Sequence, residues 1–188
     1  MRVGLLGGSF NPAHDGHLHI AALALRRLRL DQVWLMVSPG NPLKPERGMA
    51  AMSERLASAQ RIADGRRIIA TNIESKLNTR YTVDTLRELR RAFPNISFVW
   101  LMGADNLVQL PRWNEWMEIA RHTVFAVLPR PTYNHRALAG LAAQRLRPYR
   151  RLERCAPVLA NLGAPAWVFL PAPQNPQSAT AIRARLQE

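Results

Sequence analysis

The 188-residue sequence has little sulfur chemistry and no long apolar run: Cys155 is its only cysteine. A single cysteine cannot form a disulfide within the chain or build a cysteine-rich zinc site, which is typical of a protein from a reducing compartment. Nowhere do about 18 apolar residues follow one another, as a membrane-spanning helix requires. The first apolar stretch is also too short for a signal peptide. We therefore expect a cytoplasmic protein without a membrane segment.

Acidic residues are scarce, with 13 against 26 Lys and Arg, so the formal charge is +13. Lys44 and Lys76 are the only lysines, and such a preference for arginine in an alanine-rich chain is explained equally well by a GC-rich genome or by a polyanionic ligand. The densest basic stretch, residues 145–154, holds five arginines but only one aromatic residue, Tyr149. It thus lacks the interleaved aromatic side chains that stack on single-stranded nucleic acid.

Apolar patterning predicts strands that alternate with helices. Strands are expected over residues 2–6, 32–37, 68–71, 96–102, 124–128 and 167–170. Helices are expected over residues 16–30, 53–63 and 82–93, the second with Ser53 as its N-cap. No repeat or linker divides the chain, so one domain over residues 1–188 is predicted. The predicted fold class is α/β, a Rossmann-like parallel sheet with helices on both faces.

In such a sheet, ligands bind beyond the carboxyl ends of the strands. This rule selects the loops over residues 7–17, 38–45 and 103–106 as the candidate site. The first of them reads Gly7-Gly8-Ser9-Phe10-Asn11-Pro12-Ala13-His14-Asp15-Gly16-His17. Its paired glycines let the backbone come close to a ligand and admit positive φ angles.

The start of the following helix, at Gly16-His17, is predicted to bind a phosphate, because its free N–H groups and positive dipole end favour anions. His14 and His17 lie three residues apart and can both direct their rings at that anion. Metal ligation is less favoured, because no third soft ligand is near and His19 points to a different face.

The first loop resembles the G-G-[ST]-F-[DN]-P-x-H-x-G-H signature of the nucleotidylyltransferase superfamily. Within it, the chain is similar to the bacterial nicotinate-nucleotide adenylyltransferase family over nearly its whole length. The other matching segments are Pro42–Pro45, Arg80–Leu86, Gly103–Asp105, Pro111–Trp113 and Ser178–Arg183. The first and last motifs indicate the superfamily, and the segments with Tyr81 and Trp113 indicate the nicotinate branch.

Three features depart from this family. Leu43 stands where a histidine often precedes the lysine of the second loop, so a phosphate contact from that position is absent. Gln177 replaces a common apolar residue, and the sequence stops five residues after Arg183. None of these differences removes a group that the expected chemistry needs.

The resemblance implies a nucleotidylyltransferase fold and a defined reaction of NAD biosynthesis. The 5′-phosphate of nicotinate mononucleotide would attack the α-phosphorus of ATP in line, giving deamido-NAD and pyrophosphate without a covalent enzyme intermediate. Such transfers require mainly positioning and charge stabilisation from the protein. Magnesium would arrive on the ATP phosphates rather than in a protein cage. Neither a membrane nor a nucleic acid is required, and the oligomeric state stays open.

The resemblance also implies roles for individual residues. Catalytic roles are expected for His14, His17, Lys44 and Arg183. His17 would stabilise the transition state, while Lys44 and Arg183 would neutralise the phosphates and the departing pyrophosphate. Contacts with ATP are expected from Gly7, Gly8, Ser9, Phe10, His17, Asp105, Ser178, Thr180 and Arg183. Contacts with nicotinate mononucleotide are expected from Asn11, Lys44, Tyr81, Thr82 and Trp113.

Some of these residues have simpler interpretations. Asp105 could be a helix N-cap rather than a contact for ribose or a magnesium-bound water. Tyr81 and Trp113, expected to enclose the pyridine ring, could be ordinary packing residues, with Trp116 as the exposed ring instead.

Two alternative functions remain open from the sequence. Another transferase of the superfamily would adenylylate 4′-phosphopantetheine or transfer a cytidylyl group to a small phosphate, but the segments around Tyr81 and Trp113 argue against both. A basic nucleic-acid-binding protein would belong to a different class, and no recognised motif supports it. Nucleic-acid affinity would fall steeply with ionic strength, whereas a transferase would turn over its specific substrates.

Overall fold

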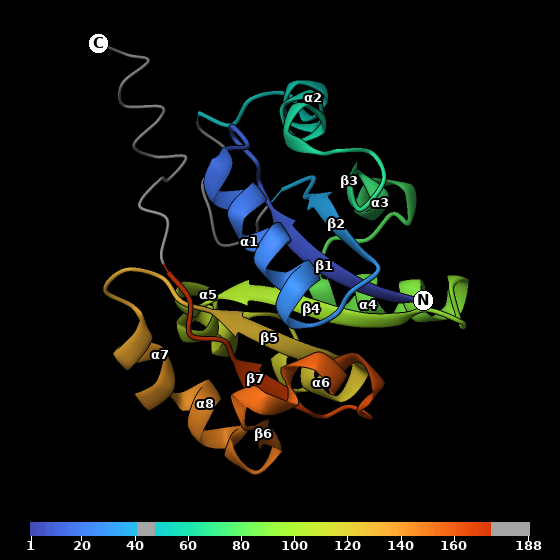
Figure 1. The fold of residues 1–188 in the computed structure, drawn as a ribbon. Helices are drawn as coiled ribbons and strands as arrows, with labels where there is room; N and C mark the ends of the chain where they lie inside the picture. Colours follow the sequence, from blue (N-terminus) through green and yellow to red (C-terminus); the bar gives the residue numbers. More distant parts are fainter. Residues whose placement is uncertain (41–47, 174–188) are drawn as a thin grey trace.

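The structure is a computed structural model, and it describes residues 1–40 and 48–173 (Figure 1). A seven-stranded sheet forms its centre, in the order β3-β2-β1-β4-β5-β7-β6, and every neighbouring pair is parallel. The strands are β1 (Arg2–Gly8), β2 (Gln32–Val37), β3 (Ile68–Thr71), β4 (Ser97–Gly103), β5 (Val124–Leu128), β6 (Arg150–Arg151) and β7 (Trp167–Phe169). This confirms the predicted Rossmann-like α/β class.

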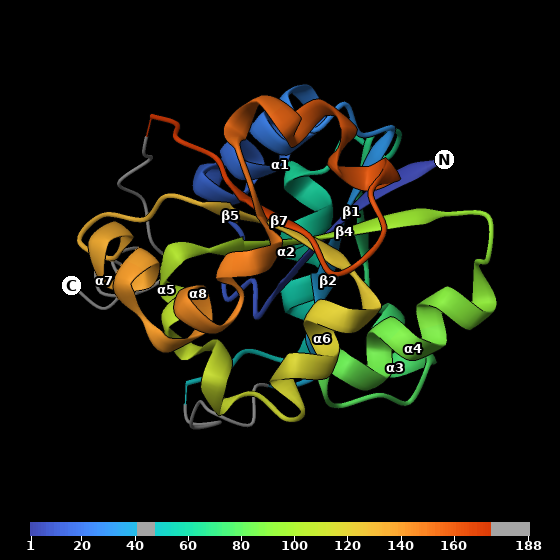
Figure 2. The ribbon, with the colours of Figure 1, turned by 90° about the horizontal axis from the view of Figure 1, so that it is seen from below.

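Helices cover both faces of the sheet (Figures 1 and 2). The α-helices of the described part are α1 (Asp15–Arg27), α2 (Met52–Ile62), α3 (Ile73–Lys76), α4 (Thr82–Ala92), α5 (Ala104–Gln109), α6 (Trp116–His122), α7 (Asn134–Ala139) and α8 (Leu141–Arg145). The 3-10 helices are η1 (Leu110–Arg112), η2 (Arg147–Tyr149) and η3 (Glu153–Asn161). No helix in these residues is long and apolar enough to cross a membrane.

The prediction of Ser53 as an N-cap is wrong. Helix α2 begins at Met52, its N-cap is Ala51, and no side chain caps it. Ser53 therefore stands inside the first turn, where its helix propensity rather than its capping ability matters. The helices α3 and α5 to α8 were not predicted, because four to seven residues are too few to show a helical period.

Two apolar cores lie on opposite faces of the sheet, because successive side chains of a strand alternate between the faces. On one face Leu6 and Leu35 pack in the same cluster as Leu28, just after α1, and Ala59 of α2. On the other face the cluster includes residues such as Leu5, Met36, Trp100, Leu86 and Leu89. Burial on both faces explains why the strands read as continuous apolar runs.

The strand order reverses direction at β1, which lies between β2 and β4. The chain builds β2 and β3 on one side of β1 and then returns to build β4 and β5 on the other. The crossovers therefore leave a crevice beyond the carboxyl ends of β1 and β4, where open α/β sheets bind their ligands. The first loop and α1 follow directly from this end of β1.

Candidate functional site

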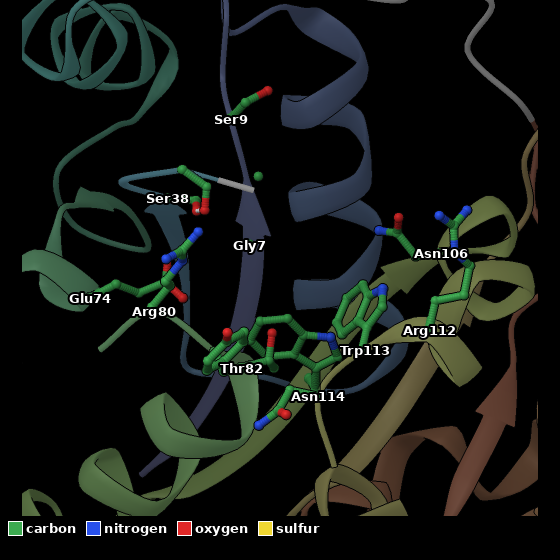
Figure 3. A pocket seen from close by; sticks show the side chains of 14 residues that line it. Gly7, Ser9, Ser38, Glu74, Arg80, Thr82, Asn106, Arg112, Trp113 and Asn114 are labelled. Carbon is green, nitrogen blue, oxygen red and sulfur yellow. Dashed lines mark hydrogen bonds between the residues drawn. The ribbon is translucent and has the colours of Figure 1, made fainter. Parts of the chain in front are cut away.

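A cavity of about 180 Å³ opens at this edge of the sheet (Figure 3). Loops after β1 and β2, the segment before α4 and the segment after η1 contribute to its walls. Six of the predicted site residues line it: Gly7, Gly8, Ser9, Tyr81, Thr82 and Trp113. Figure 3 shows Glu74 and Arg80 on one side of the cavity and Trp113, Asn106 and Arg112 on the other. The structure thus brings together residues that are far apart in sequence.

The paired glycines serve close packing rather than an unusual backbone. Both belong to the extended strand β1, and neither uses the positive φ that a glycine admits. A Cβ atom at Gly7 would come within 2.9 Å of the Trp100 ring, which occupies that space in the cavity wall. The left-handed residue of this loop is instead Phe10, with a φ of 48°. Its side chain is buried and its ring lies 4.7 Å from that of His17.

His14 and His17 meet at the start of α1, with ring centroids 3.9 Å apart. His14 is the N-cap of the helix, and its Nδ1 accepts a hydrogen bond from the Gly16 backbone N–H at 3.1 Å. In return, the backbone N–H of His14 donates to Nδ1 of His17 at 3.2 Å. Because both Nδ1 atoms accept hydrogen bonds, each neutral ring carries its proton on Nε2. The fold therefore fixes both tautomers and offers two Nε2–H donors.

Both histidines are held in the neutral form. Burial lowers the pKa of His17 to about 3, and repulsion from His14, when that ring is protonated, and from Arg130 adds to the effect. The pKa of His14 is also lowered, first by burial and then by Arg130. At neutral pH the pair consequently supplies hydrogen-bond donors without positive charge. Any charge that neutralises a bound phosphate must come from other side chains.

Arg130 is a site residue that the sequence analysis missed. It follows β5 closely, and its Nε lies 3.6 Å from Oδ1 of Asp105. Neither of these two atoms has a hydrogen-bond partner among the residues that the structure describes, although both are buried. Asp105 is the second residue of α5, whose N-cap is Gly103, so the interpretation of Asp105 as an N-cap is wrong. The pair presents a cation and a carboxylate oxygen near the histidines.

Arg55 is a second residue that was missed, and it ties the loops around the site together. Only 3% of its surface is exposed. Its Nε donates to the Ala50 carbonyl at 2.9 Å, and its Nη1 donates to the carbonyls of Ser9 and Ser38 at 2.9 and 2.7 Å. Arg55 thus joins α2 to the ends of β1 and β2.

Asn11 also fixes the first loop. Its side-chain amide donates to the Gly48 carbonyl at 2.9 Å, and its Oδ1 accepts from the Ala50 N–H at 3.3 Å. The side chain is buried. These bonds hold the loop against the segment that precedes α2, and the predicted contact of Asn11 with the mononucleotide stays a prediction.

The aromatic side of the cavity is built by Trp113, Trp100 and Tyr81. The rings of Trp100 and Trp113 are perpendicular, with centroids 6.4 Å apart. Tyr81 is 38% exposed and is the N-cap residue of α4, where no side chain caps the helix. The N–H groups of the first turn of α4 are therefore free of capping side chains beside the cavity. Trp113 and Trp116 both pack against the apolar core, but Trp116 does not line this cavity.

Four of the predicted site residues, Lys44, Ser178, Thr180 and Arg183, lie outside the described residues, as does Leu43. Their roles stay predictions from the sequence. In the residues that are described, no group of three or more His, Cys, Asp or Glu side chains could hold a metal ion.

The sheet order, the histidine pair at the first helix and the cavity at the strand reversal are the features of a Rossmann-like α/β protein with a ligand site at the carboxyl ends of its strands. The chain belongs to the cytidylyltransferase-like family, whose sequence model matches residues 5–185. Among solved structures, the chain is similar to Plasmodium falciparum nicotinic acid mononucleotide adenylyltransferase complexed with NaAD, with a TM-score of 0.72 and 15% identity. That match covers 97% of this chain and 82% of the other, and it supports the fold.

Relatives in sequence make the family assignment more specific. The chain is 62% identical over 183 residues to a probable nicotinate-nucleotide adenylyltransferase from Gluconobacter oxydans, covering 97% of this chain and 94% of the relative. It is 53% identical over 185 residues to a protein of the same name from Parvibaculum lavamentivorans, covering 98% and 92%. The chain is thus a member of the nicotinate-nucleotide adenylyltransferase family, which confirms the resemblance drawn from the sequence.

Proposed function

We propose that this chain transfers the adenylyl group of ATP to nicotinate mononucleotide, releasing deamido-NAD and pyrophosphate. The observation that carries this proposal is the pair of neutral histidines at the start of α1, beside a cavity with aromatic walls. The pair offers fixed donors for a phosphate. The cavity offers rings for a flat, aromatic acceptor. The end of β1 and Ser9 line the cavity, and the loop that follows leads to the histidines, so the two phosphates would come together at this end of the strand.

In the proposed reaction, a phosphate oxygen of the mononucleotide attacks the α-phosphorus, and the bond from that phosphorus to the bridging oxygen of pyrophosphate breaks. The Nε2–H groups of His14 and His17 donate to α-phosphate oxygens as negative charge develops on them. Arg130 supplies positive charge close to the histidines. These groups are fixed before the substrates bind, so little reorganisation accompanies the transfer.

The triphosphate enters as the magnesium complex of ATP, which is substrate rather than a resident cofactor. Magnesium keeps most of its waters and is held through phosphates, so it needs no protein cage. The buried Oδ1 of Asp105 fits a hydrogen bond from a ribose hydroxyl or from a magnesium-bound water. We assign Lys44, Ser178, Thr180 and Arg183 to the phosphates and pyrophosphate by their place in the family motifs.

The pyridine ring of the mononucleotide is placed between Tyr81 and Trp113, with its carboxylate at the uncapped start of α4. Free N–H groups, the helix dipole and the Thr82 hydroxyl favour a negative charge there. A carboxamide would direct its NH₂ group at the same donors and leave buried groups unpaired, at about 1–3 kcal/mol each. The site should therefore prefer nicotinate mononucleotide over nicotinamide mononucleotide.

The test compares kcat/KM for the two mononucleotides at fixed ATP and about pH 6.5, with pyrophosphate release as the readout. We expect a preference of about tenfold or more for the acid, as one unpaired buried donor implies. Equal or better use of the amide would overturn this placement of the carboxylate. It would leave adenylyl transfer from ATP standing as a separate question, because both acceptors report that step.

A further inference from the structure

Glu74 is a buried acid in the wall of the cavity, and the proposed reaction does not use it. It belongs to α3, is 6% exposed, and lines the same cavity as Tyr81 and Thr82. Its Oε1 accepts a hydrogen bond from the Thr85 hydroxyl at 3.3 Å, and the Ser38 hydroxyl also bonds its carboxylate. Figure 3 shows it on the same side of the cavity as Ser38 and Arg80.

No ion pair balances this acid within the part of the chain that the structure describes. The other charged or titratable side chains that line the cavity are Arg80, Arg112 and Tyr81. Arg80 and Arg112 are exposed, and neither is paired with Glu74. Burial dominates over the hydroxyl bonds and raises the pKa of Glu74 to about 7. The carboxyl group is thus poised between its neutral and ionised forms near neutral pH.

A hydroxyl relay links Glu74 to the start of α4. The Thr85 hydroxyl lies 3.3 Å from Glu74 Oε1, 3.2 Å from the Tyr81 carbonyl and 2.8 Å from the Thr79 hydroxyl. A hydroxyl has a single proton to donate. When Glu74 is ionised, Thr85 donates to the carboxylate. When Glu74 carries a proton, it can donate to Thr85 Oγ1, and Thr85 can then donate to the Tyr81 carbonyl at the helix N-cap.

We propose that Glu74 is a specificity-determining residue that carries a proton whenever the pyridine carboxylate of nicotinate mononucleotide occupies the cavity. This inference rests on the proposed placement of that carboxylate at the start of α4. Two carboxylates that share one partly apolar cavity disfavour each other's ionised form. The proton comes from solvent and forms an O–H bond on Glu74, and no bond of the substrate changes. The protonated acid leaves the substrate as the single anion in that part of the cavity.

The proposal predicts that preference for the acid over the amide falls as pH rises. Below about pH 7 the free protein already carries the proton on Glu74, so the acid binds without a further ionisation step. Above that pH, binding of the acid must first protonate Glu74, whereas the uncharged carboxamide tolerates either form. Acid binding is therefore linked to uptake of a proton, and amide binding is not.

The experiment measures the ratio of kcat/KM for the acid to kcat/KM for the amide between about pH 6 and pH 8.5. Both substrates carry the same 5′-phosphate and meet the same histidines, so ionisation of those groups cancels in the ratio. We expect the ratio to fall by about fivefold or more, the lower range of coupling between two sites. In Glu74→Gln, which resembles the protonated acid, the ratio should stay flat. In the control Glu88→Gln, at a residue of α4 that is paired with Arg91, the ratio should still fall as pH rises.

A ratio that is flat in the unchanged protein, or that falls equally in Glu74→Gln, would overturn the inference. Should Glu74→Gln not fold, calorimetry of the unchanged protein in two buffers of different ionisation enthalpy decides the matter. At pH 7.5, binding of the acid should take up more protons than binding of the amide. No preference for the acid even at pH 6 would instead refute the proposed placement of the carboxylate, so the two failures are distinguishable.

Discussion

Replacing His17 by alanine should remove a fixed phosphate donor while leaving the fold in place. The His17 ring is neutral, its Nδ1 is occupied by the His14 N–H, and its Nε2–H is the group left for the substrate. Loss of one preorganised donor to developing negative charge costs on the order of 3 kcal/mol. We therefore expect kcat to fall by about 10²-fold or more. The lost bond to the helix cap adds a stability cost of about 0.5–2 kcal/mol.

Steady-state pyrophosphate release measures the effect, and circular dichroism confirms that the variant is folded at the assay temperature. His19→Ala is the matched control, because His19 lies on the same helix and its Nε2 is within 3.1 Å of the Pro173 carbonyl, away from the histidine pair. That variant should keep kcat within about threefold, as for a side chain outside the reacting centre. A folded His17→Ala protein with nearly unchanged kcat would refute the role of this histidine.

Further changes test other parts of the account. Arg183→Lys should lower kcat/KM, because an ammonium lacks the planar fork of the guanidinium; unchanged kinetics would show that the last motif is misread. Trp113→Ala should weaken the binding of both mononucleotides by about 1–3 kcal/mol, because ring stacking is lost. The ratio of kcat/KM for the acid to that for the amide should be mostly kept, and a titration with each substrate measures both effects. Arg55→Met should reduce the free energy of unfolding by about 3 kcal/mol or more, because three buried carbonyls lose their donor. Urea unfolding measures this as a lower midpoint, and an unshifted midpoint would contradict it. Without substrates, stability should fall from about pH 6.5 towards pH 3, because the unfolded state then binds a proton that native His17 does not. Its slope, up to about 1.4 kcal/mol per pH unit, should be shallower in His17→Ala during acid unfolding.

The sheet could be predicted from the sequence because its strands are buried on both faces and appear as apolar runs. The strand predicted over residues 96–102, for example, is observed as β4 over Ser97–Gly103. Helices such as α3 and α7 could not be predicted, because they are short and contact with the rest of the fold, rather than their own pattern, sets their bounds.

Part of the site could also be predicted, since the first loop combines glycines and histidines directly after a strand. The reason for Gly7 could not be predicted, because the Trp100 ring that requires a glycine there comes from β4, which neighbours β1 in the sheet but lies far from it in the sequence. Glu74 and Arg130 both follow the carboxyl ends of predicted strands, and the rule for ligand sites in open sheets could have selected them. Arg55 gave no such signal, because its burial depends on loops that the chain brings back to α2.

The measurement that tests the central claim most directly is incubation of the protein with ATP, Mg²⁺ and a panel of acceptor phosphates, followed by identification of the products. The panel contains nicotinate mononucleotide, nicotinamide mononucleotide and 4′-phosphopantetheine. The account predicts deamido-NAD and an equal amount of pyrophosphate from nicotinate mononucleotide, as the best acceptor. Faster adenylyl transfer to 4′-phosphopantetheine, or no transfer to any acceptor by the folded protein, would contradict it.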